Sequence, residues 1–312
     1  MSVQVPTAFV EQFSSNIEHL YQEGDFALAG ATRVESINGE SAWFDQIGAG
    51  VMVKRTMRHA DTVQSDTRHD RRKVVTDPYD DSDLIDQPDQ VRMLASLEGP
   101  YAQKFQKAMN RTMTNVCLRA ANGTAYAKKN GATSVSAVVL PTGASATSQT
   151  IAVNYVKGQA RGAGTGSNTG MILDKLTEAK YILDVEDTPM GDPRYIAMTA
   201  AQLKNMLDNI TEVNSADYNN VKALVEGNVS RFLGFNFIIS NEVEVGTVGT
   251  DIASVIAWTK NAILMAKARS ATVSIDKRPD KSNSTQVFAT IDVGATRMQE
   301  PGVVQINCDQ SP

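Results

Sequence analysis

Cysteine is nearly absent from this sequence of 312 residues, which contains only Cys117 and Cys308. Two cysteines cannot build a disulfide framework, and neither stands at a metal-ligand spacing, which favours a reducing compartment. We expect both to be packing residues. A chain of this length can bury a core without covalent staples, and typical domain sizes predict about two domains.

Long apolar runs and an excess of positive charge are also missing. No run approaches the roughly 18 apolar residues of a membrane helix, and the start MSVQVPTAFVEQF lacks the basic and apolar regions of a signal peptide. We therefore expect a protein made in the cytoplasm, without a membrane partner. The formal net charge of -5 provides no general basic field, which argues against a protein that condenses DNA or recognises its sequence.

Cofactor-binding motifs are missing as well. The glycines from Gly162 to Gly170 lie between a strand-like and a helical segment, but the pattern G-x-G-x-x-G would need glycine where Ser167 or Thr169 stands. No Walker sequence is present. The sequence therefore predicts a loop and no cofactor. A nucleotide-binding α/β enzyme that uses the loop from Gly162 to Gly170 remains an alternative.

Two further sets of polar residues could carry chemistry. The histidines His19, His59 and His69 have no accompanying nucleophile motif such as G-x-S-x-G, so no catalytic residue is predicted. An acidic cluster could hold a calcium ion, but the glycine and the final glutamate of a calcium loop are missing. We expect its carboxylates to lie in solvated turns and a helix cap, without metal: Asp77, Asp80, Asp81, Asp83 and Asp86.

A predicted hairpin between Trp43 and Val75 is the most informative feature that is present. Residues 47–56 can form one strand and residues 70–75 another, with the tip somewhere in 57–68. An isolated two-stranded hairpin is only marginally stable in water. Because the sequence offers nothing obvious to cover it, we expect a neighbouring copy of the chain to do so.

Charge supports the same expectation. The hairpin is locally basic on an acidic protein, and an acidic segment follows it directly. Complementary patches that cannot meet within one chain suit a head-to-tail contact between identical copies, which closes into rings or shells. The predicted contact residues between subunits are Lys54, Arg55, Arg58, Arg68, Arg71 and Arg72 on the hairpin, with Asp80, Asp81 and Asp83 as partners.

Periodicity predicts the remaining elements. An amphipathic stripe begins at Phe9 and continues to Leu20, and residues 76–88 predict a turn-rich hinge that ends in an Asp86 helix cap. A short helix to Leu97 and a longer one from Pro100 to Asn122 should follow. Further helices are predicted at 171–183, 200–207 and 217–225, and strands at 195–198, 235–239, 271–275, 287–293 and 303–306.

The order of these segments resembles the major capsid protein of tailed bacteriophages, with its Hong Kong 97 (HK97) type of shell fold. Four stretches carry the resemblance: RKVVTDPYDDSDLIDQPD before the helices, RFLGFNFIISNEV at the end of the α/β block, SVIAWTKNAILMAKA, and the final DVGATRMQEPGVVQIN. Together they extend over nearly the whole chain. The resemblance implies an α+β fold with five segments: an N-terminal arm (1–42), an extended hairpin loop (43–76), a first peripheral part (77–130) with a spine helix (100–122), an inserted α/β axial domain (131–261), and a second peripheral part (262–312).

The same resemblance implies the function. Such a protein is a structural coat subunit without catalytic residues or cofactor, which self-assembles in the host cytoplasm into hexamers and pentamers of an icosahedral shell around double-stranded DNA, and which remains in the virion. The implied partners are further copies, a portal, a separate scaffolding protein and packaged DNA bound without sequence preference, with a decoration protein as a further candidate. The scaffolding protein is expected to be separate because only a short arm precedes the loop. A shell protein of the same fold that encloses protein cargo is the other alternative.

Overall fold

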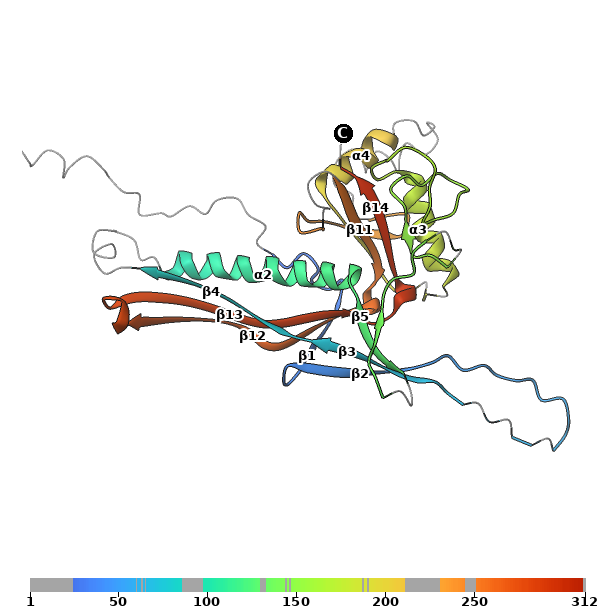
Figure 1. The fold of residues 1–312 in the computed structure, drawn as a ribbon, viewed down its shortest axis with the longest axis horizontal. Coiled ribbons are helices and arrows are strands. Elements are labelled where there is room, and N and C mark those ends of the chain that lie inside the picture. Colours follow the sequence, from blue (N-terminus) through green and yellow to red (C-terminus); the bar gives the residue numbers. More distant parts are fainter. Residues whose placement is uncertain are drawn as a thin grey trace, which may run out of the picture. The chain divides into compact units, whose positions relative to one another are not determined.

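The computed structural model describes residues 25–85, 98–129, 133–210, 231–244 and 251–310, apart from the single positions 60, 63, 65, 144, 146, 187 and 190. The chain divides into two compact units. The first comprises residues 1–26, 78–113 and 269–292, and the second comprises residues 27–77, 114–268 and 293–312. Figure 1 shows the elements of both units.

The first unit contains a long helix and a sheet. Helix α2 (Glu98–Asn122) begins here, next to the edge strand β4 (Asp77–Ile85) and the distal parts of β12 (Ile263–Arg278) and β13 (Ser284–Arg297). The 3-10 turn η3 (Pro279–Lys281) joins β12 to β13. Buried side chains on α2 and β13, among them Phe105, Met109 and Ile291, form the apolar layer of this unit.

The second unit contains the larger core. Its six-stranded sheet has the order β7-β14-β11-β8-β10-β9 and packs against helices α3 (Leu173–Val185) and α4 (Ala200–Ile210). Trp258, on strand β11 of this sheet, is fully buried and donates its indole N–H to the Ala31 carbonyl oxygen at 2.9 Å. The strands of the sheet are β7 (Thr150–Ile151), β8 (Arg194–Met198), β9 (Arg231–Phe232), β10 (Phe235–Ile239), β11 (Ile252–Thr259) and β14 (Val303–Asp309).

The hairpin also belongs to the second unit. Strand β2 (Ser41–Ile47) pairs antiparallel with β3 (His69–Val75), with Ser41 opposite Val75 and Ile47 opposite His69. The sheet continues through β5 (Ala125–Lys129) to β6 (Ser136–Val138). The base of the hairpin is therefore covered by its own chain. The remaining strand, β1 (Arg33–Ser36), pairs in parallel with residues 264–267 of β12.

Two predictions, for the first strand of the hairpin and for the hinge after it, were wrong. The first strand ends at Ile47, where the predicted strand began, and residues 48–56 form no regular structure. Gly48 and Gly50 explain this in part, because glycine weakens a strand interior through its backbone entropy and lack of a side chain. The predicted hinge at 76–88 is instead strand β4 as far as Ile85. Pro78 is compatible with that strand because β4 lies at the edge of its sheet, where proline and charged residues are tolerated.

Most other predicted elements are confirmed within a few residues: helices α3 and α4 and strands β8, β10, β13 and β14. Strand β12 contains the predicted strand at 271–275 but is much longer, because it begins at Ile263. Helix α2 begins at Glu98, so Pro100 falls in its first turn, where no backbone N–H is needed. The predicted N-terminal stripe, the Asp86 cap with its short helix, and the helix at 217–225 lie outside the described residues.

The glycine-rich loop packs against its own chain. A side chain at Gly162 would collide with the Gly143 carbonyl oxygen, and one at Gly164 would collide with the Asn154 carbonyl oxygen. Asn154 also donates its side-chain amide to the Gly164 carbonyl oxygen at 2.6 Å. These glycines allow two backbone segments to approach closely. The loop therefore offers no support for the nucleotide-binding alternative.

Candidate functional site

The tip of the hairpin, residues 48–68, exposes apolar side chains. Its described residues are exposed except for a half-buried Thr67. Met52 is 100% exposed, and Val51, Val53 and Met57 are each at least 66% exposed. Contiguous apolar exposure of this kind marks an interaction surface. Because these side chains are exposed, the described part of the chain does not cover the tip.

The two outward-facing arginines near the tip pair within the hairpin. Arg68 Nε lies 2.6 Å from an Asp70 carboxylate oxygen, and Arg71 Nε lies 2.7 Å from one of Asp45. Both arginine side chains are more than 60% exposed. Exposed ion pairs contribute only about 0 to 1 kcal/mol each. Such pairs can exchange one carboxylate for another on a partner at little cost.

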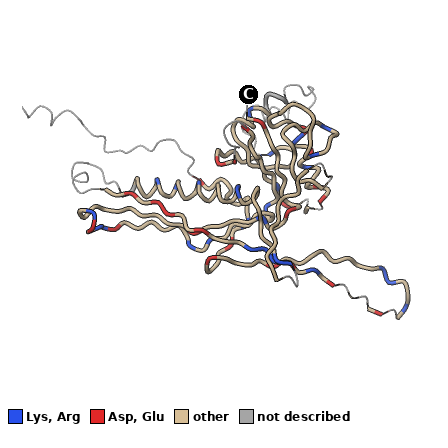
Figure 2. The backbone as a smooth tube through the Cα atoms, viewed as in Figure 1, with Lys and Arg blue, Asp and Glu red and all other residues tan. Residues whose placement is uncertain are grey.

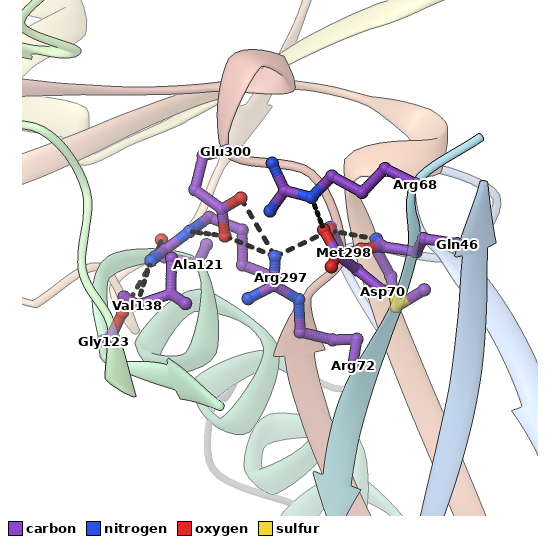
Figure 3. A network of polar contacts seen from close by, with 10 residues as sticks. All are labelled: Gln46, Arg68, Asp70, Arg72, Ala121, Gly123, Val138, Arg297, Met298 and Glu300. Atoms are coloured by element: carbon purple, nitrogen blue, oxygen red, sulfur yellow. Dashed lines mark hydrogen bonds and ion pairs between the residues drawn. The ribbon is translucent and has the colours of Figure 1, made fainter. Parts of the chain in front are cut away.

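Arg72 faces the opposite way. Successive side chains of a strand alternate between its faces, so Arg72 points inward with Val74 while Arg71 and Lys73 do not. Its side chain is 4% exposed, and Nη2 donates to both carboxylate oxygens of Glu300, at 2.7 and 2.9 Å. The same nitrogen lies 3.2 Å from the Met298 carbonyl oxygen. Arg72 therefore anchors the base of the hairpin inside its own chain, as Figure 3 shows.

Arg297 completes this buried cluster. Its side chain is fully buried, and it donates to the carbonyl oxygens of Ala121 at 2.9 Å, Gly123 at 2.8 Å and Val138 at 2.9 Å. The first of these is among the last carbonyls of α2, which have no partner within the helix. Burial lowers the pKa of the Arg297 guanidinium, while the Glu300 carboxylate 3.7 Å away raises it. Arginine stays protonated in proteins.

The cluster of Arg72, Arg297 and Glu300 joins parts of the chain that are distant in sequence. Glu300 belongs to the 3-10 turn η4 (Glu300–Gly302), Arg72 to β3, and Arg297 reaches the end of α2 and strand β6. Breaking such a buried pair is strongly destabilising because it leaves a charge without compensation. The cluster therefore fixes the base of the hairpin within the second unit.

The other predicted contact residues are on exposed surface. Lys54, Arg55 and Arg58 lie in the hairpin tip, where Arg55 Nε donates to the Met57 carbonyl oxygen at 3.1 Å. Figure 2 shows the Lys and Arg positions of the hairpin and the Asp positions of β4. Asp80 and Asp81 are exposed on β4, and Asp83 forms an ion pair with Lys104 at 3.2 Å. Among the described residues, no cation of the predicted contact set forms an ion pair with a carboxylate of that set.

Groups suited to catalysis do not gather in the described part of the chain. No three His, Cys, Asp or Glu side chains there come close enough to hold a metal ion. Cys117 and Cys308 are both fully buried, and burial raises the pKa of each thiol to about 12. A thiol with that pKa carries almost no thiolate near neutral pH and is not a nucleophile. Among the described helices, none has the length and apolar character to cross a membrane.

The described part of the chain combines a mixed α/β fold with an exposed hairpin that is anchored at its base. The chain belongs to the phage capsid protein family, whose model matches residues 5–310. It is therefore a coat protein of a phage virion and not an enzyme, and it assembles with other copies into a capsid shell. No match was found among curated proteins.

Solved structures support the fold. The capsid structure of cyanophage P-SCSP1u is 16% identical, with a TM-score of 0.70, covering 100% of this chain and 96% of that one. The capsid of Ralstonia phage GP4 is 12% identical, with a TM-score of 0.66, covering 100% and 98%. A structure of Mycobacterium phage Che8 is 16% identical, with a TM-score of 0.65, covering 96% and 97%. The predicted resemblance to phage capsid proteins of the HK97 type is confirmed.

Proposed function

We propose that copies of this chain form the hexamers and pentamers of an icosahedral shell that encloses double-stranded DNA. The observation that carries the proposal is the hairpin tip, whose apolar side chains, with Met52 100% exposed, are left uncovered by the described residues of the chain. Burying one such side chain fully contributes about 1.5–3 kcal/mol. A shell repeats that gain at every subunit, so many modest contacts add up to a stable particle.

The proposed division of the chain follows the family pattern. The arm is 1–42, the extended hairpin loop 43–76, the peripheral domain 77–130 and 262–312 with its spine helix at 100–122, and the axial domain 131–261. The pairing of β2 with β3 supports the second segment. Helix α2, which covers the proposed spine, supports the third.

The proposed contact between subunits keeps the exposed members of the predicted set. Lys54, Arg55, Arg58, Arg68 and Arg71 are exposed cations of the hairpin, and they would face Asp80, Asp81 and Asp83 of a neighbour. Arg72 is withdrawn from the set, because its guanidinium is buried against Glu300 of its own chain. Complementary charge mainly sets the rate and register of association.

Further proposed partners are a separate scaffolding protein, a portal, a decoration protein and packaged DNA. The net charge of -5 supports a container that holds DNA without sequence-specific contacts, since the chain as a whole cannot neutralise phosphate.

Negative-stain microscopy tests the proposal. The chain is expressed alone and together with the other structural proteins of its phage, and closed shells built from hexamers and pentamers are expected. Subunits that stay unassembled in both preparations would overturn the proposal. Nucleic-acid content of purified particles tests the enclosed cargo. Double-stranded DNA is expected, and protein in its place would identify a compartment shell.

A further inference from the structure

A small apolar groove lies in the first unit between β4, α2 and β13. It has a volume of about 140 Å³. Phe105, Met109 and Ile291 form its apolar wall, and each is at most 7% exposed. A cavity of about 150 Å³ accommodates benzene. The groove therefore has room for one large apolar side chain.

The rim of the groove is acidic. Asp80 and Asp81 line it from strand β4, and both residues are exposed. No ion pair to either carboxylate forms among the described residues. A segment that suits the groove should thus present one apolar side chain and, close beside it, a cation.

The hairpin tip contains such a segment. Met52 is fully exposed, and Lys54 follows two residues later. In an extended segment, side chains two residues apart point to the same side, about 7 Å from each other. Met52 and Lys54 can therefore enter one groove together, while Val51 and Val53 face the other way. Methionine also adapts well to irregular apolar gaps.

We propose that Met52 of one copy docks in the groove formed by Phe105, Met109 and Ile291 of a second copy, with Lys54 against Asp80 and Asp81. This inference rests on the proposed assembly function and specifies the residues of one contact between copies. The occupant is a second copy because Met52 is 100% exposed, so nothing in the described part of the chain covers it. The sign of charge on the tip is also opposite to that on the rim.

Cysteine cross-linking tests whether Met52 docks in the groove of a second copy. Ala108 lines the groove on α2, so the variant Met52→Cys with Ala108→Cys should form disulfides between copies in assembled particles under mild oxidation. Non-reducing gel electrophoresis should then show a ladder of linked chains. Background is low because Cys117 and Cys308 are fully buried. The matched control is Met52→Cys with Val273→Cys, an exposed position on β12 outside the groove, which should give no ladder.

Assembly measurements supply a second readout. Met52→Ser should raise the subunit concentration needed for assembly about tenfold, from the lost burial of one side chain. Met57→Ser, at an exposed tip residue that the proposal leaves outside the groove, should leave it unchanged. Lys54→Asp should impair assembly, and adding Asp80→Lys should restore it.

The outcomes separate the two proposals. The wild-type chain can form particles while the Met52→Cys with Ala108→Cys variant gives no ladder of linked chains, or gives one equal to that of the control variant. Either result would overturn the docking of Met52 in the groove and leave the proposed shell function unaffected. Equal effects of Met52→Ser and Met57→Ser also overturn this docking. Absence of particles from the wild-type chain, alone and with its phage proteins, overturns the shell function itself.

Discussion

Arg72 Nη2 lies 2.7 and 2.9 Å from the two carboxylate oxygens of Glu300, 228 positions away in the sequence. This pair fixes the base of the hairpin to the turn between β13 and β14. The adjacent Arg71 lies on the exposed face of β3 and pairs with Asp45 of the neighbouring strand β2. The two neighbouring arginines therefore have different roles, one inside the subunit and one on its surface.

The buried pair should matter for stability. Arg72→Met removes the buried cation and leaves the half-buried Glu300 carboxylate without its partner, so we expect the free energy of unfolding to fall by about 3 kcal/mol. Arg71→Met removes an exposed pair and should lower it by less than about 1 kcal/mol. Urea unfolding of the unassembled chain, followed by tryptophan fluorescence, measures both variants. Equal losses would contradict the assigned burial.

The exposed arginine should matter for assembly. Arg71→Glu reverses a charge on the outer face of the hairpin, so the unassembled chain should keep its thermal midpoint within a few degrees while shell yield falls. Sedimentation separates shells from free subunits, and the defect should grow at low salt, where surface charges are less screened. Lys180→Glu on α3, outside the hairpin, is the control for charge reversal. Normal shell yield from Arg71→Glu would remove this residue from the interface.

Lys175 should be a second buried support. Its side chain is fully buried, and the ammonium nitrogen lies within hydrogen-bond distance of four carbonyl oxygens, those of Val153 at 2.9 Å, Thr169 at 2.8 Å, Gly170 at 3.2 Å and Asn307 at 3.0 Å. Lys175→Met leaves these acceptors without their donor, and we expect a loss of at least about 3 kcal/mol in the free energy of unfolding.

A partly exposed lysine of the same helix provides the control. Lys180→Met should lower the free energy of unfolding by less than about 0.5 kcal/mol. Chemical denaturation compares the two lysine variants with the wild-type chain. A small effect at Lys175 would show that water can replace its ammonium group.

Alkaline pH should destabilise the fold through Cys308. Burial raises the pKa of this thiol from 9.0 to about 12, so the folded state holds the proton that the unfolded state releases above pH 9. The contribution is fully present below pH 9 and is lost as pH rises through about 12. Cys308→Val removes the titrating group at similar volume. Above pH 9, the free energy of unfolding of the wild type should therefore fall relative to that of this variant.

A labelling experiment checks the same burial. Ellman's reagent at pH 8 should leave the native thiols unmodified and should react with both after unfolding. Rapid labelling of the folded chain would show that the thiols are accessible.

Local sequence signals predicted elements whose apolar periodicity is strong. Helix α3 and strand β10 lie where their patterns placed them. Strand β4 was missed because its proline and aspartates favour turns, and only its position at a sheet edge makes them compatible with a strand. Whether a segment lies at an edge depends on pairing with distant strands.

The inward direction of Arg72 could have been predicted, since alternation along β3 places it on the same face as Val74. Its partners could not. Glu300 and Arg297 approach it only through the tertiary fold, and nothing in the stretch around them marks an ion pair. The groove at Phe105 likewise depends on three elements that are separate in sequence.

Strand β4 has an open outer edge that carries Pro78 and several aspartates. Proline withholds an N–H, and like charges repel when two such edges come together. Subunits crowded in an infected cell are thereby discouraged from stacking edge to edge into cross-β fibres. Strand β4 thus contributes to the proposed binding groove for a neighbouring subunit and also disfavours open-ended aggregation through its edge.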